Sequence, residues 1–343
     1  MNRFLMSAML ASVFGLGPAC AESLQFIDTQ AQFDPSDVNY SLSTQTMLQE
    51  MERVGISKIL IVPPPFPPKA PLAYDAEEIA LAIGDRTDRL AFLAGGGSLN
   101  MTILETPADA VTPEIQAVFR ARAEKILALG ALGFGEVTAE HLSLPLMKEG
   151  GLSHFHSVTA ADHPLLLLLA DIAAEKDVLI DIHFDIFPHT IPTPERLRAG
   201  NPPELAENQA AFERLLSHNR NARFTWAHLG SDPAQQRTPE LMHELLERHP
   251  NLYSAFRITA KGPHPTVALD PQGMLKPAWH KLIEAFPDRF TVHSDMFYVP
   301  GAPPRRGPKQ SHELARKLLE QLPPDLARKL AYKNAQRLYK LKH

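Results

Sequence analysis

The feature that most constrains the fold is a regular alternation of short β-rich runs with segments of helical apolar spacing. The first run, FIDTQAQF, is followed by STQTMLQEMERVGI, whose apolar residues recur at helical intervals behind a Ser/Thr start. The same pair of patterns recurs to the end of the chain. Strands are predicted at 26–33, 58–66, 90–95, 132–137, 178–184, 222–228, 252–256 and 290–295. Helices are predicted at 43–56, 75–83, 113–129, 164–176, 203–218, 239–249, 277–286, 311–321 and 324–341.

Eight strands alternating with helices predict an α/β fold, a single-domain (β/α)8 TIM barrel with parallel strands. A doubly wound open sheet is the competing architecture, but no glycine-rich phosphate loop follows the first strand. Proline accounts for 31 of 343 residues, about 9% against a usual ~5%. Because the prolines cluster after strand ends, we expect extended proline-rich βα loops around the barrel mouth, at 63–71, 188–203, 263–277 and 300–308.

The first 21 residues have the pattern of a secretory signal peptide. Asn2-Arg3 gives a short positive start, Phe4 to Leu16 is an apolar run, and Ala19-Cys20-Ala21 has small residues at the two positions that signal peptidase reads. We predict cleavage after Ala21, a mature barrel domain of residues 22–343 and a periplasmic or secreted location. A lipid anchor on Cys20 is the alternative, although the preceding GPA is a poor context for lipid attachment.

Charge and cysteine content restrict the partners. Lys plus Arg number 34 and Asp plus Glu 39, so the net charge is 34 − 39 = −5, and no basic stripe suits nucleic acid. No later stretch approaches about 18 uninterrupted apolar residues, so no membrane span is predicted. Cys20 is the only cysteine, which excludes disulfides and zinc-thiolate sites from the mature chain. A small-molecule substrate is the expected partner, and a homo-oligomer is left open.

Three polar residues stand at the ends of three separate predicted strands. His183 ends LIDIHF, His228 ends FTWAHLG, and Asp295 ends TVHSDMF. Active residues of a TIM barrel lie at the C-terminal ends of its strands. One such histidine alone would suit a hydrogen-bonded structural role, but three coincident strand ends favour a functional site with ligands or acid–base groups.

Three motifs stand out: AHLGS after one predicted strand, HSDMF after the last, and the terminal LAYKNAQRLYKL. They resemble the amidohydrolase-related family, a group of metal-dependent barrel hydrolases and decarboxylases in the amidohydrolase superfamily. The resemblance covers essentially the whole mature chain. It implies that His183 and His228 are metal ligands or substrate-polarising groups, and that Asp295 is a ligand or the base that activates water. A zinc-bound water in such a site has a pKa of about 7.

The first strand departs from that family, whose pattern there is His-x-His. Gln30 and Gln32 keep the spacing and the shared side of the strand but replace both imidazoles. A neutral carboxamide oxygen is a weak zinc donor, so a zinc site of the usual kind is doubtful. The glutamines are instead predicted to bind substrate.

Glu136, at the end of the fourth predicted strand, could rebuild a site. It either joins His183, His228 and Asp295 around a divalent metal or pairs with Arg257 in a salt bridge. We leave these alternatives open. Arg257 is also predicted to bind substrate.

Three further features are candidate components of the site. Asp185, beyond the strand end on the His183 side, is predicted to line the substrate pocket. SHFHS supplies a His-x-His pair, which we interpret as an exposed loop. The remaining pair is His293 with Asp181, for which a buried hydrogen bond is favoured over a metal role.

Three functions fit these observations. The first is an exported hydrolase acting on a small carboxylate, ester or lactone, with Asp295 as base, His183 and His228 as ligands or polarising groups, and Gln30 and Gln32 as neutral donors. The second is a metal-dependent decarboxylase or C–C hydrolase that uses a rebuilt site, as the resemblance implies. The third is a catalytically inactive periplasmic barrel that binds a small molecule.

Overall fold

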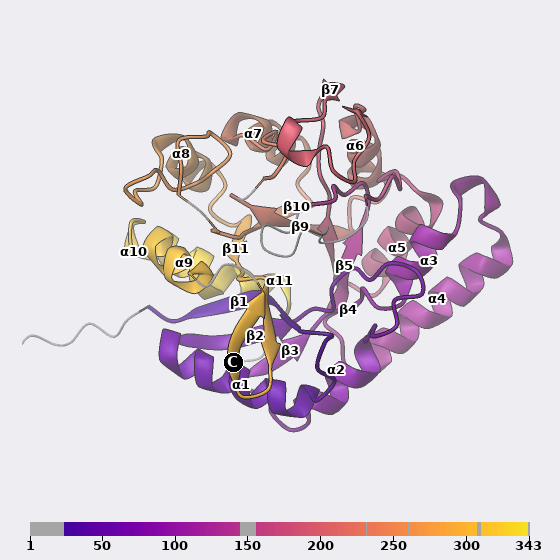
Figure 1. Ribbon diagram of the computed structural model, residues 1–343, viewed down its shortest axis with the longest axis horizontal. Helices are drawn as coiled ribbons and strands as arrows, with labels where there is room; N and C mark the ends of the chain where they lie inside the picture. Colours follow the sequence, from indigo (N-terminus) through magenta and orange to yellow (C-terminus); the bar gives the residue numbers. More distant parts are fainter. Residues whose placement is uncertain (1–23, 145–155, 231, 260, 307–309, 342–343) are drawn as a thin grey trace, which may run out of the picture.

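A computed structural model describes residues 24–144, 156–230, 232–259, 261–306 and 310–341. The predicted signal peptide lies outside this range. Eight parallel strands form the centre of the fold, and helices surround them (Figure 1). In chain order these strands are β1 (Phe26–Phe33), β2 (Ile56–Ile61), β3 (Leu90–Phe92) continued by β4 (Ala94–Gly95), β5 (Gly133–Thr138), β6 (Leu179–His183), β9 (Arg223–Leu229), β10 (Leu252–Phe256) and β11 (Phe290–Val292).

The strands close into a barrel. Pairing runs from β1 through β11, β10, β9, β6 and β5 to β4, while β1 also pairs with β2 and β2 with β3. The short interruption between β3 and β4 does not open the ring. There the Leu93 N–H donates to the Ile61 carbonyl (3.0 Å), and the Phe92 carbonyl accepts from Leu132 N–H (2.9 Å). The predicted (β/α)8 barrel is therefore confirmed.

Each barrel strand is followed by a helix. Several helices begin with proline at their first turn, where its missing N–H has no helical partner to lose. Threonine side chains cap two of these, Thr112 accepting from Ile115 N–H and Thr238 from Leu241 N–H. The helices are α1 (Tyr40–Val54), α2 (Ala76–Ile83), α4 (Pro113–Ala128), α5 (Pro164–Glu175), α6 (Gln209–His218), α7 (Pro239–Arg248), α8 (Pro277–Ala285) and α9 (Ser311–Leu319).

The main differences from the predicted elements lie in the loops above the strand ends. The predicted helix at 203–218 begins only at Gln209, because Glu204–Leu205 (β8) pairs with Ile191–Pro192 (β7). Beyond β11 the chain bends at Asp295 and continues as β12 (Met296–Val299), which pairs with β1 and with β13 (Ala302–Arg306). A short helix, α3 (Leu99–Glu105), was not predicted.

The last predicted helix contains three parts. These are α10 (Pro324–Arg328), a π-helical turn (Lys329–Lys333) and α11 (Asn334–Leu338). Asn334, within the motif LAYKNAQRLYKL, donates to the Pro287 and Phe290 carbonyls and so fixes this segment to β11. Among the described residues no helix is long and apolar enough to cross a bilayer.

A buried charge cluster attaches α9 to the first strand. His312 of α9 contacts Asp28 of β1 (Nε2 to Oδ2, 3.0 Å) and Glu50 of α1 (Nδ1 to Oε1, 3.6 Å). Burial opposes protonation of His312, but these carboxylates raise its pKa from 6.5 to about 9. Asp28 also accepts the N–H of Ser294, next to Asp295 (2.9 Å). The cluster thereby links a peripheral helix to the strand ends.

This cluster makes the free energy of unfolding depend on pH. Because the folded-state pKa of His312 is raised, its stabilisation is complete below pH 6.5 and is lost as the pH rises through about 9. We expect unfolding in urea to show a loss of about 3 kcal/mol over this interval. His312→Gln should flatten the slope, whereas His280→Gln on α8 should preserve it. An unchanged slope in His312→Gln would contradict this assignment.

Candidate active site

Polar side chains from five barrel strands meet at the C-terminal end of the barrel. Glu136 comes from β5, His183 from β6 and His228 from β9. Gln30 and Gln32 come from β1, and Asp295 directly follows β11. All but His183 are less than a tenth exposed. Parallel strands bring these ends together, as the sequence pattern requires.

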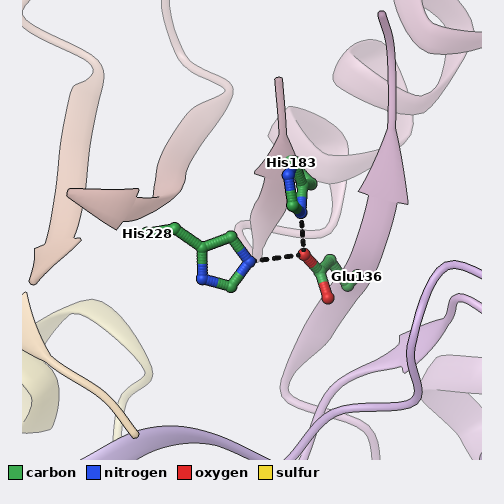
Figure 2. Close-up of side chains that lie close together, drawn as sticks. All are labelled: Glu136, His183 and His228. Carbon is green, nitrogen blue, oxygen red and sulfur yellow. Dashed lines mark hydrogen bonds and ion pairs between the residues drawn. The ribbon is translucent and has the colours of Figure 1, made fainter. Parts of the chain in front are cut away.

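Glu136 is the centre of one group. Its Oε1 lies 2.7 Å from Nδ1 of His183 and 3.0 Å from Nε2 of His228, and Figure 2 shows both imidazoles directed at this oxygen. Its Oε2 accepts a hydrogen bond from Nε2 of Gln30 (2.9 Å). One carboxyl group therefore orients three side chains from three other strands.

Asp295 is the centre of a second group. Gln32 donates to its Oδ1 (2.7 Å), and the guanidinium of Arg257 lies 2.9 Å from its Oδ2. The backbone N–H of Asp295 donates to the Gln30 carbonyl (2.9 Å). Asp295 and His228 both have positive φ, 54° and 63°, a conformation that non-glycine residues seldom adopt. Such strain is common where a side chain is held for function.

Burial separates the protonation behaviour of these groups. It raises the pKa of Glu136 to about 8, although the Arg257 charge and the Gln30 hydrogen bond oppose the shift. It raises the pKa of Asp295 to about 6, with Arg257 again opposing. It lowers the pKa of His183 to about 4 and that of His228 well below its ordinary range. At neutral pH both imidazoles are neutral, Asp295 is mostly ionised, and Glu136 is mostly protonated.

The structure places the other predicted site residues as follows. Arg257 makes its ion pair with Asp295 rather than with Glu136, so the Glu136–Arg257 salt bridge, one of the two alternatives from the sequence, is not formed. Asp185 is buried beyond β6, and its Oδ2 accepts from Leu142 N–H (2.8 Å). The two glutamine nitrogens are already hydrogen-bonded, but the glutamine oxygens have no partner among the described residues.

Two predictions about histidines need correction. Nε2 of His293 accepts a hydrogen bond from the backbone N–H of His228 (3.2 Å). Nδ1 of His293 has no hydrogen-bond partner within the described part of the chain, and neither has Oδ1 of Asp181. The predicted His293–Asp181 hydrogen bond is therefore not formed. SHFHS was predicted to be an exposed loop, but the side chain of His156, its second histidine, is only 11% exposed and lies 3.9 Å from Glu140. His154 falls outside the described residues.

Two residues at the mouth were missed. The guanidinium of Arg237 is buried and donates to the carbonyls of Ala227 (2.6 Å) and His228 (2.8 Å), which holds the end of β9. His141 follows β5, and its ring centroid is 3.7 Å from that of His183. Its position five residues after Glu136 offered a signal, since loops after barrel strands carry functional groups. Nothing in the sequence indicated the role of Arg237.

The family follows from a comparison over most of the chain. The family model described as Amidohydrolase matches residues 106–341. The chain belongs to the amidohydrolase family. This confirms the resemblance seen in the strand-end and C-terminal motifs. No curated protein matches the sequence.

Solved structures of this fold are similar over their whole length. A 2,6-dihydroxybenzoate decarboxylase complexed with 2,6-dihydroxybenzoate is 15% identical, with a TM-score of 0.53 over 92% of this chain and 99% of the other. A dihydroxybenzoic acid decarboxylase from Polaromonas sp. JS666, with bound manganese and 2-nitroresorcinol, is 13% identical, with a TM-score of 0.51 over 93% and 98%. At these identities the likeness establishes the barrel fold of this amidohydrolase.

The strand ends of this amidohydrolase fit a divalent cation only in part. Ligand atoms of Glu136, His183 and His228 lie within 4.8 Å of one another, and two imidazoles with a carboxylate are suitable donors. The two β1 glutamines direct N–H groups, not oxygens, at Glu136 and Asp295. The candidate ligand set therefore lies on β5, β6 and β9 and excludes β1.

Proposed function

We propose that this amidohydrolase is an exported hydrolase that cleaves an ester or lactone bond in a small carboxylate substrate. The observation that carries the proposal is Asp295, a buried carboxyl group with a pKa of about 6 that Gln32 and Arg257 fix at a strand end. A general base works best when its pKa is near the working pH. Esters and lactones need less activation than amides, so a carboxylate with hydrogen-bond donors is sufficient.

In the proposed reaction Asp295 takes a proton from water as the water oxygen attacks the carbonyl carbon. The bond to the leaving oxygen then breaks, and protonated Asp295 returns the proton to the alkoxide. Arg257, whose buried Nε has no partner among the described residues, binds an anionic oxygen of the substrate. The unpaired oxygens of Gln30 and Gln32 accept hydrogen bonds from water or a substrate hydroxyl.

A second candidate function rests on the Glu136–His183–His228 group. When bound there, a divalent cation would polarise a substrate oxygen and acidify a water molecule. Metal-dependent decarboxylation or C–C hydrolysis of an aromatic acid is the reaction class that this group favours. The products differ, because only decarboxylation releases carbon dioxide, and C–C hydrolysis, unlike ester or lactone hydrolysis, frees no hydroxyl group.

The hydrolase proposal predicts a specific pH profile on a panel of lactones, esters and aromatic carboxylates. With Asp295 as the base, kcat/KM should fall below an apparent pKa of about 6 and level off above it, because only the ionised carboxylate accepts a proton. Acid released at constant pH measures hydrolysis, and carbon dioxide measures decarboxylation. A clean preparation that binds panel compounds but turns none over supports an inactive binder.

The export proposal predicts the mass of the mature protein. Protein purified from the periplasm should have the mass of a chain that begins at Glu22.

A further inference from the structure

A second polar cluster contains His183 but neither Glu136 nor His228. It consists of His141, His183 and Asp185, whose ligand atoms all lie within 4.8 Å of one another. The His141 and His183 rings meet edge to face, with 3.7 Å between their centroids and 81° between their planes. His141 and Asp185 are 7% and 3% exposed. Two imidazoles and a carboxylate thus converge in a mostly buried position that the proposed reaction does not use.

Backbone hydrogen bonds hold this cluster in place. The N–H of Asp185 donates to the Glu140 carbonyl (2.9 Å), and the N–H of Leu142 donates to Oδ2 of Asp185 (2.8 Å). Asn208 donates to the Asp185 carbonyl and to the Glu140 side chain, both at 2.9 Å. The loop that carries His141 is therefore tied on both sides of His141 to the segment after β6. Ligands held in this way need little rearrangement to bind an ion.

His183 is oriented as metal-ligating histidines usually are. Such a ring donates one N–H to a carboxylate, which leaves the lone pair of the other nitrogen for the metal. Nδ1 of His183 is 2.7 Å from Glu136, and Figure 2 shows the other ring nitrogen on the side away from that carboxyl. The ring nitrogen directed away from Glu136, Nε2, is therefore the His183 atom that this cluster offers to an ion.

We infer that His141, His183 and Asp185 form a divalent-cation site distinct from the Glu136–His183–His228 group, with which it shares only His183. Two imidazole nitrogens and one carboxylate oxygen suit Zn²⁺ or Co²⁺ better than Mg²⁺ or Ca²⁺. Three protein ligands leave a coordination position for an anionic oxygen of a bound molecule. The inference does not depend on the proposed reaction, because it concerns binding alone. The two candidate sites would use different nitrogens of His183.

The test uses Co²⁺ as the probe on metal-stripped protein, with titration calorimetry and the visible absorption of bound Co²⁺ as readouts. The wild type should bind Co²⁺, and Asp185→Asn and His141→Gln should each weaken binding at least 100-fold. His228→Gln, which removes a ligand of the other group and none of this cluster, should change the affinity less than threefold. Circular dichroism identifies any variant that fails to fold, and the two ligand variants test the site independently.

The opposite pattern would overturn the inference. Loss of Co²⁺ binding in His228→Gln, with binding retained in folded Asp185→Asn and His141→Gln, would assign the ion to the Glu136 group. A wild type that binds no Co²⁺ or Zn²⁺ at millimolar concentration would exclude both sites. Neither result bears on hydrolysis by Asp295, so failure here and failure of the proposed function are distinguishable.

Discussion

Asp295→Asn should lower kcat on any substrate that the enzyme hydrolyses by about 10²–10⁴-fold, the usual contribution of a positioned general base. The carboxamide keeps the shape of the side chain and one oxygen for Arg257, and Gln32 can rotate to accept from its NH₂ group, but it cannot take a proton from water. The fall in activity below pH 6 should also disappear from the residual rate, because no group with that pKa remains at this position. Initial rates from pH 5 to 9, at saturating and limiting substrate, measure both effects.

A change in binding alone must be separated from a change in chemistry. The affinity for substrate or product, measured by calorimetry, should remain within about tenfold in Asp295→Asn, since Arg257 is unchanged. Asp325→Asn is a suitable control, because its side chain is 90% exposed on α10. Residual kcat within tenfold of the wild type, with the same pH profile, would remove Asp295 from the role of base.

The sequence was sufficient to predict the barrel, and that its strand-end polar residues meet, for a physical reason. Parallel strands joined by helices must align their C-terminal ends, so polar residues at those ends necessarily meet. The same rule predicts that His183, His228 and Asp295 lie at one end of the barrel. Glu136 was identified by the same rule, and the structure shows it between the two imidazoles.

The sequence could not predict which atoms pair. Both Glu136 and Asp295 follow from the strand-end rule, and only the structure shows that Arg257 pairs with Asp295. The spacing of His293 and Asp181 fitted a hydrogen bond, but the positive φ of His228 brings the His228 backbone N–H to His293 instead. His141 and the β7–β8 hairpin lie in loops, whose paths depend on contacts distant in sequence. Strand periodicity carries no information on such contacts.

The largest effect on stability is expected from replacing Glu136 with leucine. The change removes the hydrogen-bond partner of three side chains, those of Gln30, His183 and His228. A buried donor left without a partner costs about 1–3 kcal/mol. Glu136→Leu should therefore lower the free energy of unfolding by about 3–6 kcal/mol, a large part of the ~5–15 kcal/mol typical of a folded protein. Urea unfolding monitored by circular dichroism measures this loss.

Glu136→Gln separates the hydrogen bonds from the carboxyl charge. Its carboxamide oxygen can still accept from both imidazoles, while its NH₂ group faces Gln30. The Gln30 amide can then rotate to present its oxygen, which has no partner in the wild type among the described residues. We therefore expect Glu136→Gln to lose less than about 2 kcal/mol. Glu195→Leu, with the wild-type side chain 90% exposed, controls for leucine itself. Equal losses in the leucine and glutamine variants would contradict the role of Glu136 as the shared hydrogen-bond partner.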